Sequence, residues 1–76
     1  MNASDFIEIN PKVMMGKPVI KGTRVTVEII LEKLSHGFGF SEILKAYPNL
    51  TEEKIKAALA FAAELLNGDA VYPVSK

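Results

Sequence analysis

The residues best suited to chemistry in this chain are three cations, Lys17, Lys21 and Arg24, which lie in one short stretch with no acid among them. Lysine and arginine side chains bind phosphate oxygens, and hydroxyl groups such as that of Thr23 add donors to the same anion. Solvated turns also commonly carry cations. The stretch therefore predicts either a phosphate-contacting surface or an ordinary polar turn.

The remaining side chains do not favour an enzyme. The 76 residues include one histidine, His36, and no cysteine, so a Cys-His pair and a thiolate metal site are excluded. Glu52 and Glu53 are adjacent, which points them about 100° apart on a helix and favours a role at the helix N-terminus over shared acid–base chemistry. We therefore predict no catalytic residue, no metal site and no cofactor.

Composition predicts a small soluble domain. Nine basic and nine acidic residues cancel, so net charge does not favour nonspecific binding to nucleic acid or to a membrane. No apolar run approaches the roughly 20 residues that span a bilayer, and the lack of cysteine fits a reducing compartment. We expect a cytoplasmic protein with one domain over residues 1–76. Because so short a chain buries little of its surface alone, we also expect a homodimer.

The elements that must position the cations begin with a predicted β-hairpin region, residues 5–25. Residues 7–9 alternate apolar and acidic side chains, as a half-buried strand does. Residues 13–15 are expected to be extended and to pair with residues 18–20 across a turn centred on Gly16-Lys17. The first four residues are expected to fray.

Three helices are predicted to follow the hairpin, forming a bundle over residues 26–66. Apolar residues recur with the helical period over residues 27–36, 40–47 and 52–66. Thr26 and Thr51 are expected to cap the first and third of these helices. The second and third helices, with the short turn between them, match a helix-turn-helix, although any small three-helix bundle gives the same pattern.

The third helix has two contrasting faces. Its broad apolar arc is the expected core face, made of Ile55, Ala58, Leu59, Ala62, Leu65 and Leu66. The outer arc is rich in alanine beside one phenylalanine, which suits packing against another protein chain, the alternative being a merely tolerant surface. We predict partner contacts there at Ala57, Ala60, Phe61 and Glu64.

The same helix is poorly suited to reading bases. A helix that reads the major groove usually presents Arg, Lys, Asn or Gln, whereas this one starts with Glu52 and Glu53. We therefore place any nucleic-acid contact mainly on the cationic stretch. The predicted nucleic-acid-binding residues are Lys17, Lys21, Thr23, Arg24 and Lys54.

Two blocks of sequence carry a family resemblance. Residues 16–24 read Gly-Lys-Pro-x-Ile-x-Gly-Thr-Arg and residues 42–48 read Glu-Ile-Leu-x-x-Tyr-Pro. With these blocks the chain closely resembles the domain-of-unknown-function 433 family over about residues 7–63. Gly39 departs from the family, which commonly caps the second helix with Ser or Thr.

The resemblance implies a fold and a function. The fold is mainly α, a homeodomain-like three-helix bundle containing a helix-turn-helix and preceded by a small N-terminal β-hairpin. The function is that of a VapB-type antitoxin of a type II toxin–antitoxin pair, usually encoded beside a PIN-type ribonuclease toxin.

Our leading hypothesis is a non-enzymatic antitoxin that neutralises such a toxin and binds operator DNA as a dimer. The C-terminal tail, residues 67–76, is expected to add partner contacts through Val71, Tyr72 and Val74. The alternative is a structural or adaptor module that dimerises and binds protein without binding DNA.

Overall fold

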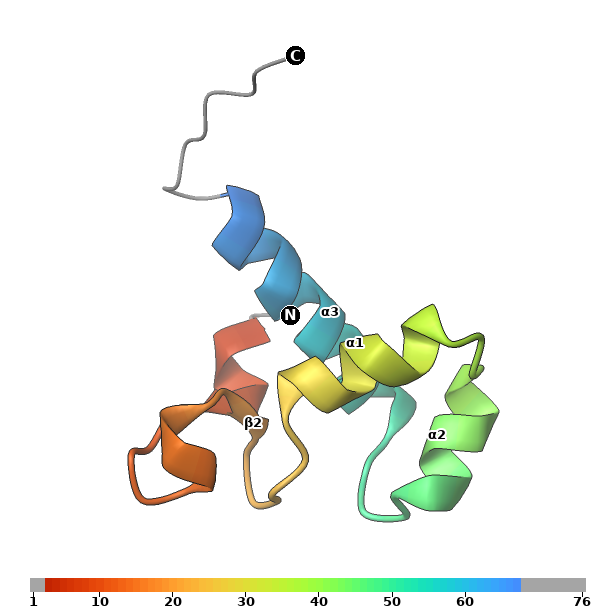
Figure 1. The fold of residues 1–76 in the computed structure, drawn as a ribbon, viewed down its shortest axis with the longest axis horizontal. Helices are drawn as coiled ribbons and strands as arrows, with labels where there is room; N and C mark the ends of the chain where they lie inside the picture. Colours follow the sequence, from red (N-terminus) through yellow and green to blue (C-terminus); the bar gives the residue numbers. More distant parts are fainter. Residues whose placement is uncertain (1–2, 68–76) are drawn as a thin grey trace.

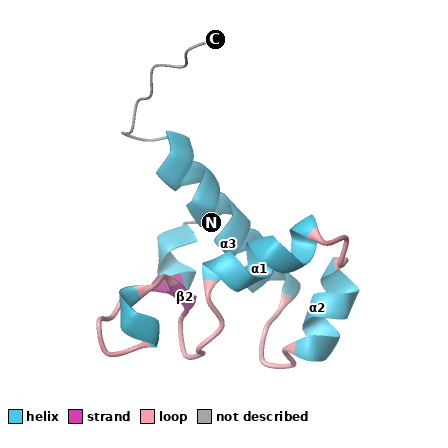
Figure 2. Ribbon diagram, viewed as in Figure 1, coloured by secondary structure: helices cyan, strands magenta, loops and turns pink. Residues whose placement is uncertain are grey.

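Three helices form most of the protein, and two very short strands precede them. The structure is a computed structural model that describes residues 3–67. The helices are α1 (Val27–Ser35), α2 (Phe40–Ala46) and α3 (Glu52–Asn67), and the strands are β1 (Ile7–Glu8) and β2 (Val19–Ile20) (Figures 1 and 2). Two 3₁₀ turns, η1 (Ala3–Phe6) and η2 (Met14–Gly16), lie before and after β1. The predicted fold class, a three-helix bundle behind a small antiparallel hairpin, is confirmed.

Strand β2 is hydrogen-bonded on both of its edges. β1 pairs with it in the antiparallel direction, with Ile7 opposite Ile20. On the other edge Val19 bridges to Thr26, and the Ile20 N–H donates to the Val25 carbonyl at 3.0 Å. A short turn therefore joins β2 to the extended chain that leads into α1.

The predicted pairing of residues 13–15 with residues 18–20 is wrong. Met14 and Met15 have φ angles of 50° and 59°, and Gly16 has 83°, so three consecutive residues adopt left-handed backbone. The chain consequently winds into η2 at the point where an extended strand was expected. Left-handed backbone costs a residue other than glycine about 1 to 2 kcal/mol, and no propensity in the sequence indicates it.

Both predicted threonine caps are confirmed. The Thr26 hydroxyl accepts a hydrogen bond from the Ile29 N–H at 3.0 Å, and the Thr51 hydroxyl accepts one from the Lys54 N–H at 3.2 Å. These bonds satisfy N–H groups that a helix start leaves without a partner. All three helices begin where the sequence predicts and end within one residue of the predicted position.

The junction between α1 and α2 depends on two glycines. Gly37 has a φ of 92° and ends α1, as expected for a glycine just beyond a helix. Gly39 precedes α2 and has no side chain with which to cap it. The Glu42 carboxylate accepts the Gly39 N–H at 2.7 Å, so α2 is tied to its N-cap residue by its own third residue.

The core lies where β2 meets the three helices. Ile20, Ile30, Ile43 and Ile55, one from each of these elements, are fully buried. The start of the chain does not fray from Ala3 onward, contrary to prediction, because η1 packs against α3 and Ala3 is buried.

Candidate nucleic-acid and partner interfaces

Two cations lie at the turn that follows β2, and a hydrogen bond and one positive φ angle define the backbone of this turn. The Thr23 N–H donates to the Ile20 carbonyl at 3.0 Å, and Gly22 has a φ of 80°, as the third residue of a type II turn requires. Lys21 and Arg24 are exposed on this turn. Within residues 3–67 neither of them forms an ion pair, so their charges are available to a ligand.

The side chain of Thr23 is used by the turn itself. Its hydroxyl donates to the Ile20 carbonyl at 2.8 Å and accepts the Val25 N–H at 3.0 Å. A hydroxyl has a single proton to donate, so no donor remains for a phosphate oxygen. In the structure the Thr23 side chain closes the turn, and its contact with phosphate stays a prediction.

The other two predicted cations lie elsewhere. The Lys17 ammonium group donates to the Glu28 carboxylate at 3.1 Å, which ties its charge to α1. Lys54 is half-buried in the first turn of α3, next to the exposed Glu52 and Glu53. Lys21 and Arg24 thus lie together on the turn, while Lys17 and Lys54 lie apart from them on other elements, and the nucleic-acid contacts of all these residues stay predictions.

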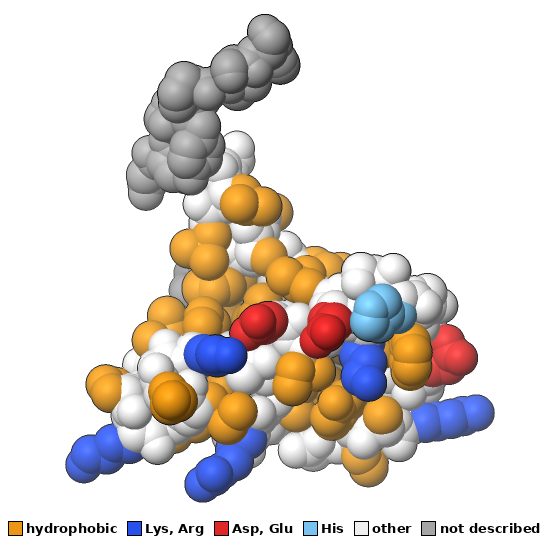
Figure 3. All heavy atoms as spheres, in the orientation of Figure 1, with side chains coloured by type: hydrophobic (Ala, Val, Ile, Leu, Met, Phe, Trp, Pro, Cys, Tyr) orange, Lys and Arg blue, Asp and Glu red, His pale blue; other side chains and the backbone are white. Residues whose placement is uncertain are grey.

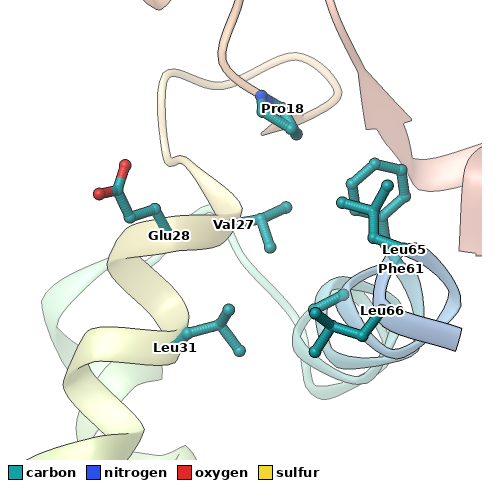
Figure 4. Close-up of a pocket in the computed structure, with 8 residues that line it drawn as sticks. Pro18, Val27, Glu28, Leu31, Phe61, Leu65 and Leu66 are labelled. Carbon is teal, nitrogen blue, oxygen red and sulfur yellow. The ribbon is translucent and has the colours of Figure 1, made fainter. Parts of the chain in front are cut away.

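An apolar groove lies between α1 and the C-terminal half of α3 (Figure 4). Its volume is about 340 Å³, and its two walls face each other across the gap. The space-filling view shows hydrophobic side chains gathered along α3 (Figure 3). The residues that line the groove are Pro18, Val27, Glu28, Leu31, Phe61, Ala62, Leu65 and Leu66.

The groove exists because α3 is longer than its neighbours. With 16 residues against 9 in α1, α3 extends roughly 24 Å against roughly 14 Å at 1.5 Å per residue. Its C-terminal end projects beyond the bundle (Figure 1), and Leu65 and Leu66 are 59% and 73% exposed. The prediction that these two leucines belong to the core is wrong. The unequal lengths of the predicted helices were the signal that could have revealed the groove.

The predicted partner contacts on α3 fall into three groups. Ala57 is fully buried, which corrects its placement on the outer arc, and η1 packs against α3. Phe61 is half-buried at the edge of the core and also lines the groove. Ala60 and Glu64 are exposed as expected. The remaining predicted contacts lie outside the described residues: Val71, Tyr72 and Val74.

Other site chemistry is limited in the part of the chain that the structure describes. No group of three or more His, Asp or Glu side chains there lies close enough together to hold a metal ion. Over the same residues no helix has the length and apolar character needed to cross a bilayer. The candidate sites are thus a cationic turn and an apolar groove.

Comparison with known proteins gives three matches. Residues 7–62 match the family described as "Protein of unknown function (DUF433)". The chain is 33% identical over 60 residues to "Uncharacterized protein y4eO" of Sinorhizobium fredii (strain NBRC 101917 / NGR234), a match that covers 79% of this chain but only 27% of that protein. A crystal structure of a DUF433 member protein from Anabaena variabilis ATCC 29413 matches with a TM-score of 0.73 and 32% identity, covering 82% of this chain and 59% of that one. The chain thus spans little more than a quarter of the curated relative.

Proposed function

The chain belongs to the DUF433 family, and from this premise we propose that it is an antitoxin-like, non-enzymatic protein. It binds and neutralises a PIN-type ribonuclease toxin by protein contact, and as a dimer it binds operator DNA. The observation that supports this proposal is the separation of two surfaces in one small domain. A turn with two free cations lies after β2, and an exposed apolar surface lies at the end of α3.

The DNA-binding part of the proposal rests on the turn and not on α3. Glu52 and Glu53 are exposed at the start of α3, where a groove-reading helix would meet bases and phosphates, and their charge opposes that contact. Lys21 and Arg24 are exposed and unpaired, whereas Lys17 is bound to a carboxylate. Phosphate contact through the turn would position the protein on a duplex without base-specific readout.

The protein-binding part rests on the exposed end of α3. Leu65 and Leu66 project from the bundle, and Ala60 and Glu64 are exposed on the same helix. Exposed apolar surface of this kind is typical of protein–protein interfaces. We propose that the toxin contacts this end of α3 and the residues that follow it.

Salt dependence tests the DNA-binding part. The probe is a duplex that covers the promoter region of the protein's own gene. Removing two phosphate contacts with Lys21→Ala and Arg24→Ala should lower the slope of log K against log salt by about 1.8, at roughly 0.9 per contact. The matched control is Lys45→Ala with Lys56→Ala, two exposed lysines on other elements. An unchanged slope in the first double variant would remove the turn from the DNA surface.

Co-expression tests the protein-binding part. The product of the adjacent open reading frame should co-purify with the wild-type chain, and its toxicity should be relieved. Leu65→Asp with Leu66→Asp should weaken both effects, and deletion of residues 69–76 should do the same. Ile9→Asp, at a similarly exposed apolar residue on another part of the molecule, is the control. Full relief of toxicity by both altered forms would contradict the proposed interface.

The alternative is an adaptor module that dimerises and binds protein without DNA. The observations that favour it are the balance of nine basic and nine acidic residues and the acidic start of α3. Under this alternative neither the promoter duplex nor an unrelated duplex binds, while sedimentation still reports a dimer.

A further inference from the structure

The groove between α1 and α3 is bounded by residues 3–67 but not filled by them. We propose that a segment of the same chain docks in it, namely Val71-Tyr72-Pro73-Val74, which follows α3 in the sequence. At about 340 Å³ the groove is the size of a small binding pocket, near the lower end of the roughly 300 to 1,000 Å³ range that such pockets span. It suits a few apolar side chains.

The length of the segment 71–74 matches the length of the α3 wall of the groove. The α3 wall runs from Phe61 to Leu66, a distance of about 8 Å along the helix axis at 1.5 Å per residue. Four extended residues span about 13 Å, enough to cover that wall and continue toward α1. Residues 68–70 add up to about 10 Å for the chain to turn back from the end of α3.

The residue types in the connecting stretch favour such a reversal. Gly68 follows Asn67, the last residue of α3. Glycine in this position commonly ends a helix, and its left-handed backbone redirects the chain. Asp69 and Ala70 then precede the apolar segment, so the docking residues are the first large apolar side chains after the turn.

The charges also agree with docking in this direction. Glu28 is the one charged residue that lines the groove, and its carboxylate already binds the Lys17 ammonium group at 3.1 Å. The apolar segment therefore meets no unpaired charge. A chain running from Leu66 toward Pro18 brings Lys76 toward Glu28, and the two charges are opposite.

Docking has a consequence for the proposed antitoxin. The segment would cover Leu65 and Leu66 in the free protein, and a toxin that captures the segment would expose these leucines for its own contact. That exchange rests on the proposed function. Docking itself does not, and the experiment below measures it without any partner.

A spin label on the segment tests the proposal in the full chain. The protein has no cysteine, so Ser75→Cys accepts a single nitroxide. If the segment docks, the amide signals of Val27 and Leu31, on the far wall of the groove, should lose more than half of their intensity. The same label in a chain with Val71→Asp and Val74→Asp should leave those two signals almost unchanged.

Two comparisons keep the test decisive. In the first, the spin-labelled chain carries Ile9→Asp, a similar change away from the groove. Its label should broaden the amide signals of Val27 and Leu31 as strongly as the label in the parent chain does. Equal broadening with and without the aspartates at positions 71 and 74 would show that tethering alone brings the label close, and the proposal would be wrong. Mixing ¹⁵N-labelled chain without the nitroxide and unlabelled chain with it should give no broadening. Broadening in that mixture would place the segment on a second copy and overturn docking within one chain.

Discussion

Two regions of the molecule differ in how their backbone is hydrogen-bonded and their side chains are buried. The first is the hairpin that leads into α1, and the second is the C-terminal half of α3. In the hairpin, β2 is hydrogen-bonded on both edges and Val19 and Ile20 are fully buried, while the turn that follows carries two exposed cations. In α3 the helical backbone satisfies itself, yet Leu65 and Leu66 remain exposed. Backbone pairing and side-chain burial are therefore separate requirements, and α3 fulfils only the first within residues 3–67. An additional apolar surface is therefore expected at the C-terminal end of α3 and not at β2.

Truncation of one apolar side chain in each region should give the largest contrast. Ile20→Ala removes a fully buried side chain of β2, and we expect the free energy of unfolding to fall by about 2 to 5 kcal/mol. Leu66→Ala, made in a chain that also carries Val71→Asp and Val74→Asp so that no segment docks, removes a mostly exposed side chain and should change it by less than about 0.5 kcal/mol. Urea denaturation followed by circular dichroism measures both. In the chain without the two aspartates a docked segment covers this leucine, so Leu66→Ala should cost more there, above about 1 kcal/mol. Equal costs in the two chains would contradict docking.

The same contrast explains what the sequence could predict. The positions of Thr26, Thr51 and Gly37 specify helix ends through local hydrogen bonds and backbone angles, so the helices were predicted to within one residue. Helical periodicity assigns Leu65 and Leu66 to the same arc as Ile55. Periodicity does not show which element packs against each turn of a helix. Because α1 is too short, it does not cover the last turn of α3.

Two other errors have equally physical causes. Helical periodicity places Ala57 on an outer arc, but it does not show that η1 packs against α3, where Ala57 is fully buried. The left-handed backbone at Met14 and Met15 has no local signal, since neither residue type favours it. The use of the Thr23 hydroxyl within the turn could not be foreseen, because its two hydrogen bonds depend on the closed turn.

A backbone substitution tests how strictly the hairpin turn is defined. Gly22 has a φ of 80° and open space around its missing side chain, so any cost of substitution comes from the backbone angle alone. Gly22→Ala should lower the free energy of unfolding by about 1 to 2 kcal/mol. Gly22→Asn should cost less, because asparagine adopts left-handed backbone more readily. Equal costs for the two variants in thermal denaturation would show that the turn does not hold this angle in solution.

Removal of the two threonine N-caps compares the start of α1, next to the hairpin, with the start of α3. Thr26 is buried where the hairpin meets α1, and Thr51 is exposed at the start of α3. Thr26→Ala should destabilise the protein by about 1 to 2 kcal/mol and Thr51→Ala by about 0.5 kcal/mol, within the range measured for N-caps. The difference arises because the Ile29 N–H loses its partner in a buried place. Chemical denaturation of both variants checks the order, and a larger loss for Thr51→Ala would reverse it.

The ion pair between Lys17 and Glu28 links the two regions and should have the smallest effect. Lys17 precedes β2, and Glu28 lines the groove, but the two side chains are 54% and 68% exposed. Solvent screening limits such pairs, so a double-mutant cycle with Lys17→Ala and Glu28→Ala should give a coupling energy of about 0.2 to 1 kcal/mol. Raising the salt concentration to about 1 M, where the Debye length is near 3 Å, should reduce it further. A coupling that survives high salt would mean that the pair is shielded from solvent in the full chain. Repeating the double-mutant cycle in a chain with Val71→Asp and Val74→Asp then shows whether the segment 71–74 shields the ion pair from salt.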